Sequence, residues 1–151
     1  MAAWAEIEKD APEFATRVRA RFDAGTNKTI ATVRADGSPR ISAVELQLKD
    51  GQATFGMMGG SRKLADVLRD PRIAVHCPTL EPPEGDPSAW EGDAKLAGVA
   101  VPVGAVSGEA EGSAFRVDVT EVVLTYVGTP ADHLVIETWH PGRGWQRLTR
   151  R

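Results

Sequence analysis

Between Trp4 and Phe22 the apolar residues recur at intervals of three and four, which is the spacing of one face of an α-helix. This stripe consists of Trp4, Ile7, Ala11, Phe14, Val18 and Phe22. Pro12 lies inside the stretch and has no amide hydrogen to donate to a helical carbonyl. The pattern therefore predicts an N-terminal helix that breaks in two near Pro12.

The period then changes from that of a helix to that of a strand. Residues 29–33 are rich in β-branched side chains, and residues 35–38 have the composition of a turn. Apolar and polar positions alternate over residues 44–49 and, after an Asp-Gly turn, again over residues 53–57. This alternation predicts a three-stranded antiparallel meander over residues 29–57, whose apolar face needs a second layer or closure.

A short second helix is expected directly after the third strand. Ser61 is a typical N-cap residue, and Asp70-Pro71 is a typical helix end. The apolar stripe between them consists of Leu64, Val67 and Leu68. We expect this stripe to pack against the sheet.

The rest of the chain alternates between β-rich stretches and turns. The β-rich stretches are residues 73–77, 95–106, 115–127, 133–139 and 145–148. Residues 78–92 are rich in Pro, Glu, Gly and Asp and are expected to form a long surface loop. Many short strands with few helices predict a mainly β fold, an antiparallel barrel of about six to eight strands that is closed or partly closed.

Composition limits the possible functions. At 151 residues and 42% hydrophobic positions, the chain is expected to form one domain over residues 1–151. Its 18 basic and 21 acidic residues give a net charge of −3 without a long basic run, which argues against general nucleic-acid binding. We expect no membrane-spanning segment and a cytoplasmic location.

The cysteine and the histidines give little sign of a metal site. Cys77 is the single cysteine, which excludes an intrachain disulfide and a CxxC zinc site. The three histidines lie far apart, without acidic or cysteine residues at ligand spacing, so no metal site is expected. His76 precedes Cys77, but neighbours in a strand point to opposite faces, and Cys77 is therefore interpreted as a buried small residue.

The most informative segment is residues 57–63, where a strand passes through two glycines into a helix start. Arg62 and Lys63 occupy the first helical turn, where the helix dipole is already positive, so two cations there are locally unfavourable. A bound anion would compensate, because free amides, an arginine fork and a lysine ammonium together suit a phosphate. The alternative is that both cations are solvated surface charges.

Several blocks in order resemble the pyridoxamine 5'-phosphate oxidase-like split-barrel family. They are residues 29–40, residues 55–63 with the Ser-Arg-Lys block, and residues 70–75. A weaker similarity covers residues 92–98 and the C-terminal strand pair that holds Trp139 and Trp145. The resemblance implies a split β-barrel with an N-terminal helix and a short helix after the third strand.

The resemblance also implies a homodimer with FMN in the groove between the subunits. The Ser-Arg-Lys block would contact the cofactor phosphate, residues 40–44 would run beside the ribityl chain and the flavin ring, and the strand ending at residue 58 would flank the site. A C-terminal tryptophan would reach the pocket of the partner subunit or serve as a core aromatic. The cofactor-binding residues implied are Arg40, Ser42, Val44, Met57, Met58, Ser61, Arg62, Lys63 and Trp139.

The function implied is oxidation or reduction of an unidentified small molecule. Glu45 stands where the vitamin B6 oxidases tend to carry a lysine, which argues against that particular reaction. A branch of the same superfamily binds a deazaflavin coenzyme through a similar Arg-Lys block, so this coenzyme is the alternative to FMN. A non-enzymatic flavin- or haem-binding module and a cofactor-free barrel also stay open. No catalytic side chain is assigned, because the cofactor supplies the redox chemistry.

Overall fold

The computed structural model describes residues 2–106 and 112–151 and shows a mainly β protein. The helices are α1 (Trp4–Asp10), α2 (Pro12–Phe22), α3 (Arg62–Arg69) and the short 3₁₀ helix η1 (Pro87–Ala89). The strands are β1 (Lys28–Val33), β2 (Pro39–Val44), β3 (Gln47–Lys49), β4 (Gln52–Met58), β5 (Arg72–His76), β6 (Asp93–Val106), β7 (Gly112–Val127), β8 (Leu134–His140) and β9 (Gly144–Arg150).

One antiparallel sheet carries the fold, with strand order β2-β1-β5-β6-β7-β4-β3. The long strand β7 also pairs with β8, which pairs with β9. The edge strands β2 and β3 follow each other in the chain and are joined by Glu45 and Leu46. The sheet therefore curls until its two edges meet at this joint without pairing with each other, which is the split barrel expected.

The meander predicted over residues 29–57 is wrong in one respect. Its first hairpin forms, since β1 pairs with β2, but β4 pairs with β3 and β7. The predicted return strand is broken at the joint into β2 and β3. The strand ending at Met58 is therefore the fourth strand and not the third, and α3 follows it as expected. Val44, Leu46 and Leu48 are all buried, so the alternation runs through the break and gave no sign of it.

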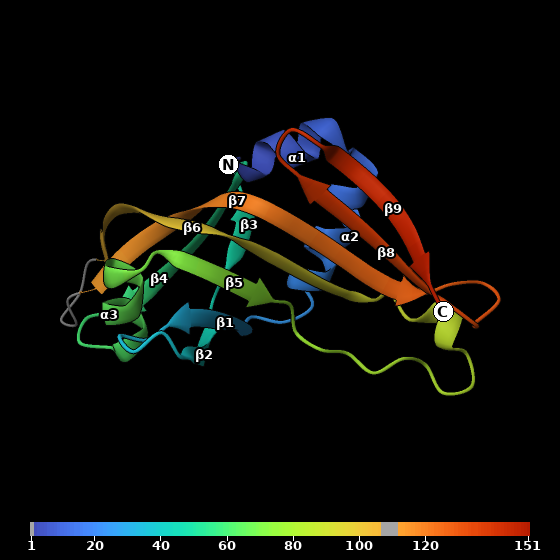
Figure 1. Ribbon diagram of the computed structural model, residues 1–151, viewed down its shortest axis with the longest axis horizontal. Helices are drawn as coiled ribbons and strands as arrows, with labels where there is room; N and C mark the ends of the chain where they lie inside the picture. Colours follow the sequence, from blue (N-terminus) through green and yellow to red (C-terminus); the bar gives the residue numbers. More distant parts are fainter. Residues whose placement is uncertain (1, 107–111) are drawn as a thin grey trace.

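The N-terminal helix does break at Pro12, which occupies the first turn of α2, where a missing amide hydrogen costs nothing. Trp4 and Ile7 of α1 and Phe14, Val18 and Phe22 of α2 are buried in the core, as the helical stripe predicted. In Figure 1 these two helices lie beside β8, whereas α3 lies at the opposite side, near the turn between β1 and β2. No helix among the described residues has the length and apolarity to cross a membrane.

Helix α3 begins as the sequence predicted, because the Ser61 hydroxyl accepts a hydrogen bond from the Leu64 amide at 3.3 Å. Leu64 and Val67 are buried, but Leu68 is 63% exposed, so the predicted apolar stripe is wrong at that position. Asp66 is the third buried residue of the helix instead. The sheet-facing side of α3 therefore carries a charge, and this charge organises the candidate site.

Candidate functional site

Arg62 and Lys63, in the first turn of α3, have different contacts. The Lys63 ammonium donates to the carbonyl oxygen of Ala43 on β2 at 2.7 Å. Arg62 is exposed and lines a hollow beside the helix start. Among residues 2–106 and 112–151, neither cation forms an ion pair with a carboxylate.

The hollow beside Arg62, here called the arginine hollow, has a volume of about 390 Å³. It is lined by Arg34, Ala35, Asp36, Arg40, Arg62, Ala65, Asp66 and Arg69. Four guanidinium groups against two carboxylates leave an excess of two positive charges. The donors are forked and converge from the β1–β2 turn, β2 and α3, so this set of side chains suits a phosphate.

Asp66 lies at the floor of the arginine hollow, with a side chain only 4% exposed. One carboxylate oxygen accepts from the Thr32 hydroxyl and from Arg40 Nε, both at 2.8 Å, and the other accepts from Arg69 at 3.1 Å. Burial by itself raises the pKa of this carboxyl, but the hydrogen bonds from Arg40, Thr32 and Arg69 outweigh it and lower the pKa to about 2. Asp66 therefore stays ionised, and it holds the Arg40 guanidinium in place through a hydrogen bond from Nε.

Of the other predicted cofactor residues, two have partly exposed side chains near the start of α3 and two are buried in the core. Ser42 is half-buried on β2, and Met58 is 66% exposed at the end of β4, next to the glycines that lead into α3. Val44 and Met57 are 3% and 2% exposed and belong to the core. A ligand outside the barrel would therefore reach these two residues through their backbone atoms.

Trp139 is not near α3 in this chain. It is buried on β8, and its indole nitrogen donates to Asp10 of α1 at 2.8 Å. Trp90 also has a structural anchor, because its indole donates to the Leu80 carbonyl at 2.9 Å and its ring lines a hollow against α2. A cofactor contact by Trp139 depends on a second subunit and stays a prediction.

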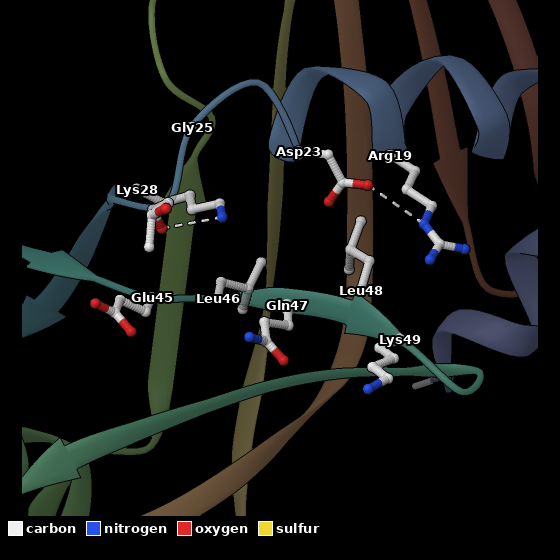
Figure 2. A pocket seen from close by; sticks show the side chains of 10 residues that line it. Arg19, Asp23, Gly25, Lys28, Glu45, Leu46, Gln47, Leu48 and Lys49 are labelled. Carbon is white, nitrogen blue, oxygen red and sulfur yellow. Dashed lines mark hydrogen bonds and ion pairs between the residues drawn. The ribbon is translucent and has the colours of Figure 1, made fainter.

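A second hollow, here called the β3 hollow, has a volume of about 470 Å³ and was not foreseen in the sequence. It lies between the end of α2 and β3, and Figure 2 shows side chains of both charges around it. Lys28 on its wall is largely buried, donates to the Thr26 carbonyl at 3.0 Å, and has its pKa lowered by that burial. Glu45 lines the same hollow directly after β2. In the sequence, the one unusual residue of this hollow was Glu45, which stands where the vitamin B6 oxidases tend to carry a lysine.

A buried carboxylate elsewhere has a structural explanation. Glu137 on β8 accepts two hydrogen bonds from Arg17 at 2.7 and 2.6 Å, one from the Tyr126 hydroxyl at 2.6 Å and one from the Trp145 indole at 2.9 Å. Burial raises the pKa of Glu137, but these bonds outweigh it and the pKa is lowered. With its oxygens satisfied by protein donors, this group ties α2 to the β8–β9 hairpin.

No family model and no curated protein matches the sequence. Solved structures do match it. PhzG from Burkholderia lata, in complex with tetrahydrophenazine-1-carboxylic acid, has a TM-score of 0.67 at 12% identity, over 97% of this chain and 92% of the other. A pyridoxamine 5'-phosphate oxidase-related FMN-binding protein from Nostoc punctiforme has a TM-score of 0.64 at 10% identity, over 93% and 96%. The chain has the split-barrel fold of these proteins.

The same split-barrel fold is found in an F420 reductase, with a TM-score of 0.52 at 15% identity, over 68% of this chain and 92% of the other. The structural neighbours thus agree with the resemblance drawn from residues 29–75. At these identities they establish the split-barrel fold, and the ligand of this chain has to be argued from its own residues.

Proposed function

We propose that this split barrel binds a phosphorylated flavin-type cofactor and uses it to oxidise or reduce a small molecule. The observation that carries the proposal is the cluster of cations around the start of α3, whose charge exceeds that of the carboxylates by two. A phosphate monoester carries up to two negative charges, whereas a phosphodiester carries one. The charge balance therefore favours FMN, with the deazaflavin coenzyme as the alternative.

Strand β2 gives the proposed site its direction. Arg40 at its start lines the arginine hollow, Ala43 receives Lys63, and Glu45 just past its end lines the β3 hollow. Five residues at about 3.3 Å each separate Arg40 from Glu45 by roughly 16 Å, which suits a phosphate, a ribityl chain and a ring system laid along the strand. Ser42 would lie at the middle of this path, and Met58 would flank it.

The chain's own residues would bind and orient the cofactor. FMN, when bound, supplies hydride or electron transfer, so the protein needs no nucleophile or metal of its own for that step. Arg62, Arg40 and Lys63 would hold the phosphate. The β3 hollow, with Glu45 and Lys28 on its wall, would receive a polar substrate beside the ring.

A homodimer is part of the proposal. On the outward face of the sheet, one row of paired positions carries the small residues Ala31, Ala74 and Ala97, and at the edge of this row Ile41 is 74% exposed. A second copy placed on this row would cover Ile41 and turn an open surface site into a groove. Sedimentation of the purified protein measures this directly, and a monomer at all concentrations would remove the second subunit from the proposal.

The test of phosphate binding compares FMN with riboflavin, which lacks the phosphate, in fluorescence titrations. The wild type is expected to bind FMN more tightly, and replacing both Arg62 and Lys63 with alanine is expected to erase that preference. Charged hydrogen bonds contribute roughly 1.5–3 kcal/mol each, so FMN affinity should fall about 100-fold or more, while riboflavin affinity should barely change.

The matched control removes two exposed cations from β9, Arg147 and Arg150, and should leave both affinities unchanged. Equal loss of FMN and riboflavin binding in the Arg62 and Lys63 variant would contradict the phosphate assignment. Tight binding of the deazaflavin coenzyme but not of FMN would change the cofactor. Bound flavin that no acceptor reoxidises would identify a binding module and contradict the enzymatic part.

A further inference from the structure

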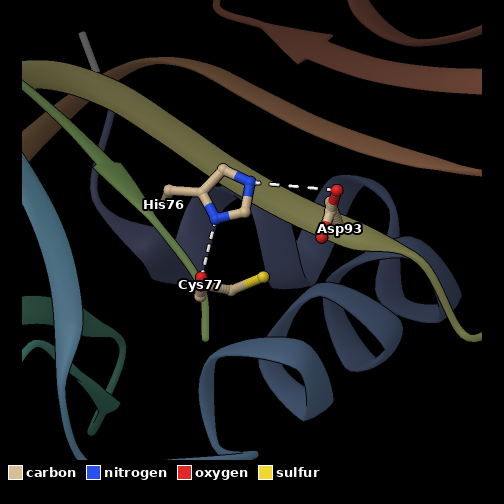
Figure 3. A group of neighbouring side chains, drawn as sticks. All are labelled: His76, Cys77 and Asp93. Atoms are coloured by element: carbon tan, nitrogen blue, oxygen red, sulfur yellow. Dashed lines mark hydrogen bonds and ion pairs between the residues drawn. The ribbon is translucent and has the colours of Figure 1, made fainter. Parts of the chain in front are cut away.

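Three side chains that can bind a metal meet where β5 ends and β6 begins. Strand pairing places His76 opposite Lys95, which brings Cys77 beside Ala94 and Asp93 next to them. One ligand atom from each of His76, Cys77 and Asp93 lies within 4.8 Å of the other two. Figure 3 shows the imidazole and the carboxylate facing each other, with the thiol beneath the ring.

Cys77 is 3% exposed and belongs to the core, as the sequence predicted, while His76 is half-buried. The thiol and the imidazole nevertheless lie near each other just past the end of β5, which the alternation of side chains in a strand did not lead us to expect. Asp93 is distant in the sequence, and only the pairing of β5 with β6 brings it near. Neither fact is visible in residue spacing.

The hydrogen bonds of His76 prepare one ring nitrogen for a metal. Nδ1 lies 2.6 Å from the Cys77 carbonyl oxygen, and because a carbonyl only accepts, Nδ1 carries the hydrogen. In the neutral ring this leaves a lone pair on Nε2, which faces Asp93 Oδ2 at 4.0 Å, too far for a hydrogen bond. A backbone carbonyl that fixes the ring of a metal-binding histidine in this way is a common arrangement.

The other two groups also suit a cation. Asp93 Oδ1 is buried and has no hydrogen-bond partner among the described residues. The Cys77 sulfur accepts a hydrogen bond from the Ala94 amide at 3.2 Å, which is the kind of contact that stabilises a metal-bound thiolate. Binding of a divalent ion would release the thiol proton of Cys77 to solvent as the metal–sulfur bond forms.

We propose that His76 Nε2, Cys77 Sγ and Asp93 form a binding site for a divalent zinc-type ion. Nitrogen, sulfur and oxygen ligands together are typical of Zn²⁺, and three protein ligands leave a fourth position open. Side chains of His76 and Asp93 are about one-third exposed, so that position faces solvent. Nearby cations are Lys95, which is exposed, and Arg21, whose charge is offset by an ion pair with Glu91. The site is independent of the flavin proposal.

The experiment uses full-length protein stripped with a chelator and titrated separately with Zn²⁺ and Co²⁺. One equivalent per chain is expected, and bound Co²⁺ should show thiolate-to-metal charge-transfer absorption, which only a sulfur ligand produces. Zinc should also raise the melting temperature, because a ligand that binds the folded state stabilises it. Failure to bind either ion, or Co²⁺ bound without the charge-transfer band, overturns the proposal.

Variants separate the three ligands from a nonspecific effect. His76→Gln and Asp93→Asn alter partly exposed side chains, and each is expected to weaken Zn²⁺ binding at least about tenfold, a loss that even supporting residues of metal sites produce. Cys77→Ser should abolish the charge-transfer band. His133→Gln is the matched control, since His133 also contacts an aspartate, Asp132 at 2.7 Å, and it should bind Zn²⁺ as the wild type does. Wild-type Zn²⁺ affinity in His76→Gln would show that His76 is no ligand and would overturn the proposed site.

Discussion

Replacing Asp66 with asparagine is expected to lower the free energy of unfolding by about 2 kcal/mol at neutral pH. Asparagine keeps the shape but has one uncharged acceptor oxygen, so it keeps the hydrogen bonds from Thr32 and Arg40 in weakened form and loses the one from Arg69. Hydrogen bonds to charged groups contribute roughly 1.5–3 kcal/mol and neutral ones about 1 kcal/mol, while the half-exposed Arg69 recovers part of its loss in water. In a urea titration followed by tryptophan fluorescence, the midpoint should fall by about 1 M.

The pH dependence gives this prediction its sharpest form. The pKa of Asp66 is lowered from 3.8 to about 2 in the folded chain, so its stabilising contribution is complete above about pH 4 and is lost as the pH falls towards 2. The gap between wild type and Asp66→Asn should therefore close over that interval.

Asp70→Asn is the matched control for Asp66→Asn. The hydrogen bond from Arg72 lowers the pKa of Asp70 to about 2 as well, but Arg72 is largely exposed. Losing this exposed ion pair in Asp70→Asn should therefore lower the free energy of unfolding much less. An equal midpoint shift in the two variants, or a gap that persists at low pH, would refute the reasoning.

Two further substitutions test other parts of the fold. Glu137→Ala should destabilise the protein by about 2–3 kcal/mol, because the Tyr126 hydroxyl and the Trp145 indole lose their acceptor, while Arg17, whose side chain is 46% exposed, recovers part of its loss in water; a loss below about 1 kcal/mol in urea unfolding would contradict the assigned role. Gly98→Ala should lower the free energy of unfolding by about 3 kcal/mol or more. The new methyl group would lie 2.2 Å from the Asp118 carbonyl oxygen, at a register shift between β6 and β7, so that paired backbone would have to move. Thermal melting should show a clear drop for Gly98→Ala and little change for the neighbouring Ala97→Ser, and equal melting temperatures would contradict the close approach.

Local signals in the sequence predicted local structure well. The break at Pro12 and the cap at Ser61 were both confirmed, because each depends on one residue and its nearest turn. The stripe of α3 was wrong at Leu68, because a buried position of that helix is taken by Asp66. A charged residue in an apolar face gives no sequence signal of burial unless its partners are known, and Arg40 and Thr32 lie on other elements.

For the candidate site, residue types identified Arg62 and Lys63 as unusual, since two cations in a first helical turn oppose the dipole. Their surroundings could not be inferred. The arginine hollow draws its side chains from a turn, a strand and a helix, and the β3 hollow depends on the joint between β2 and β3. Trp139, assigned to the cofactor by resemblance, is placed against α1 by a contact across 129 residues.

The β-rich elements, the helix ends and a cation pair at a helix start could be predicted along the chain, because these follow from period, capping and charge within a few residues. The order of the sheet, the break in the return strand and the grouping of buried charges appear only in the folded structure. Those features arise from pairings between distant strands, such as the one that brings Asp93 to His76, and the free energy of such a contact depends on both partners at once. A local pattern in the sequence includes only one partner of such a contact and does not show which distant residue is the other.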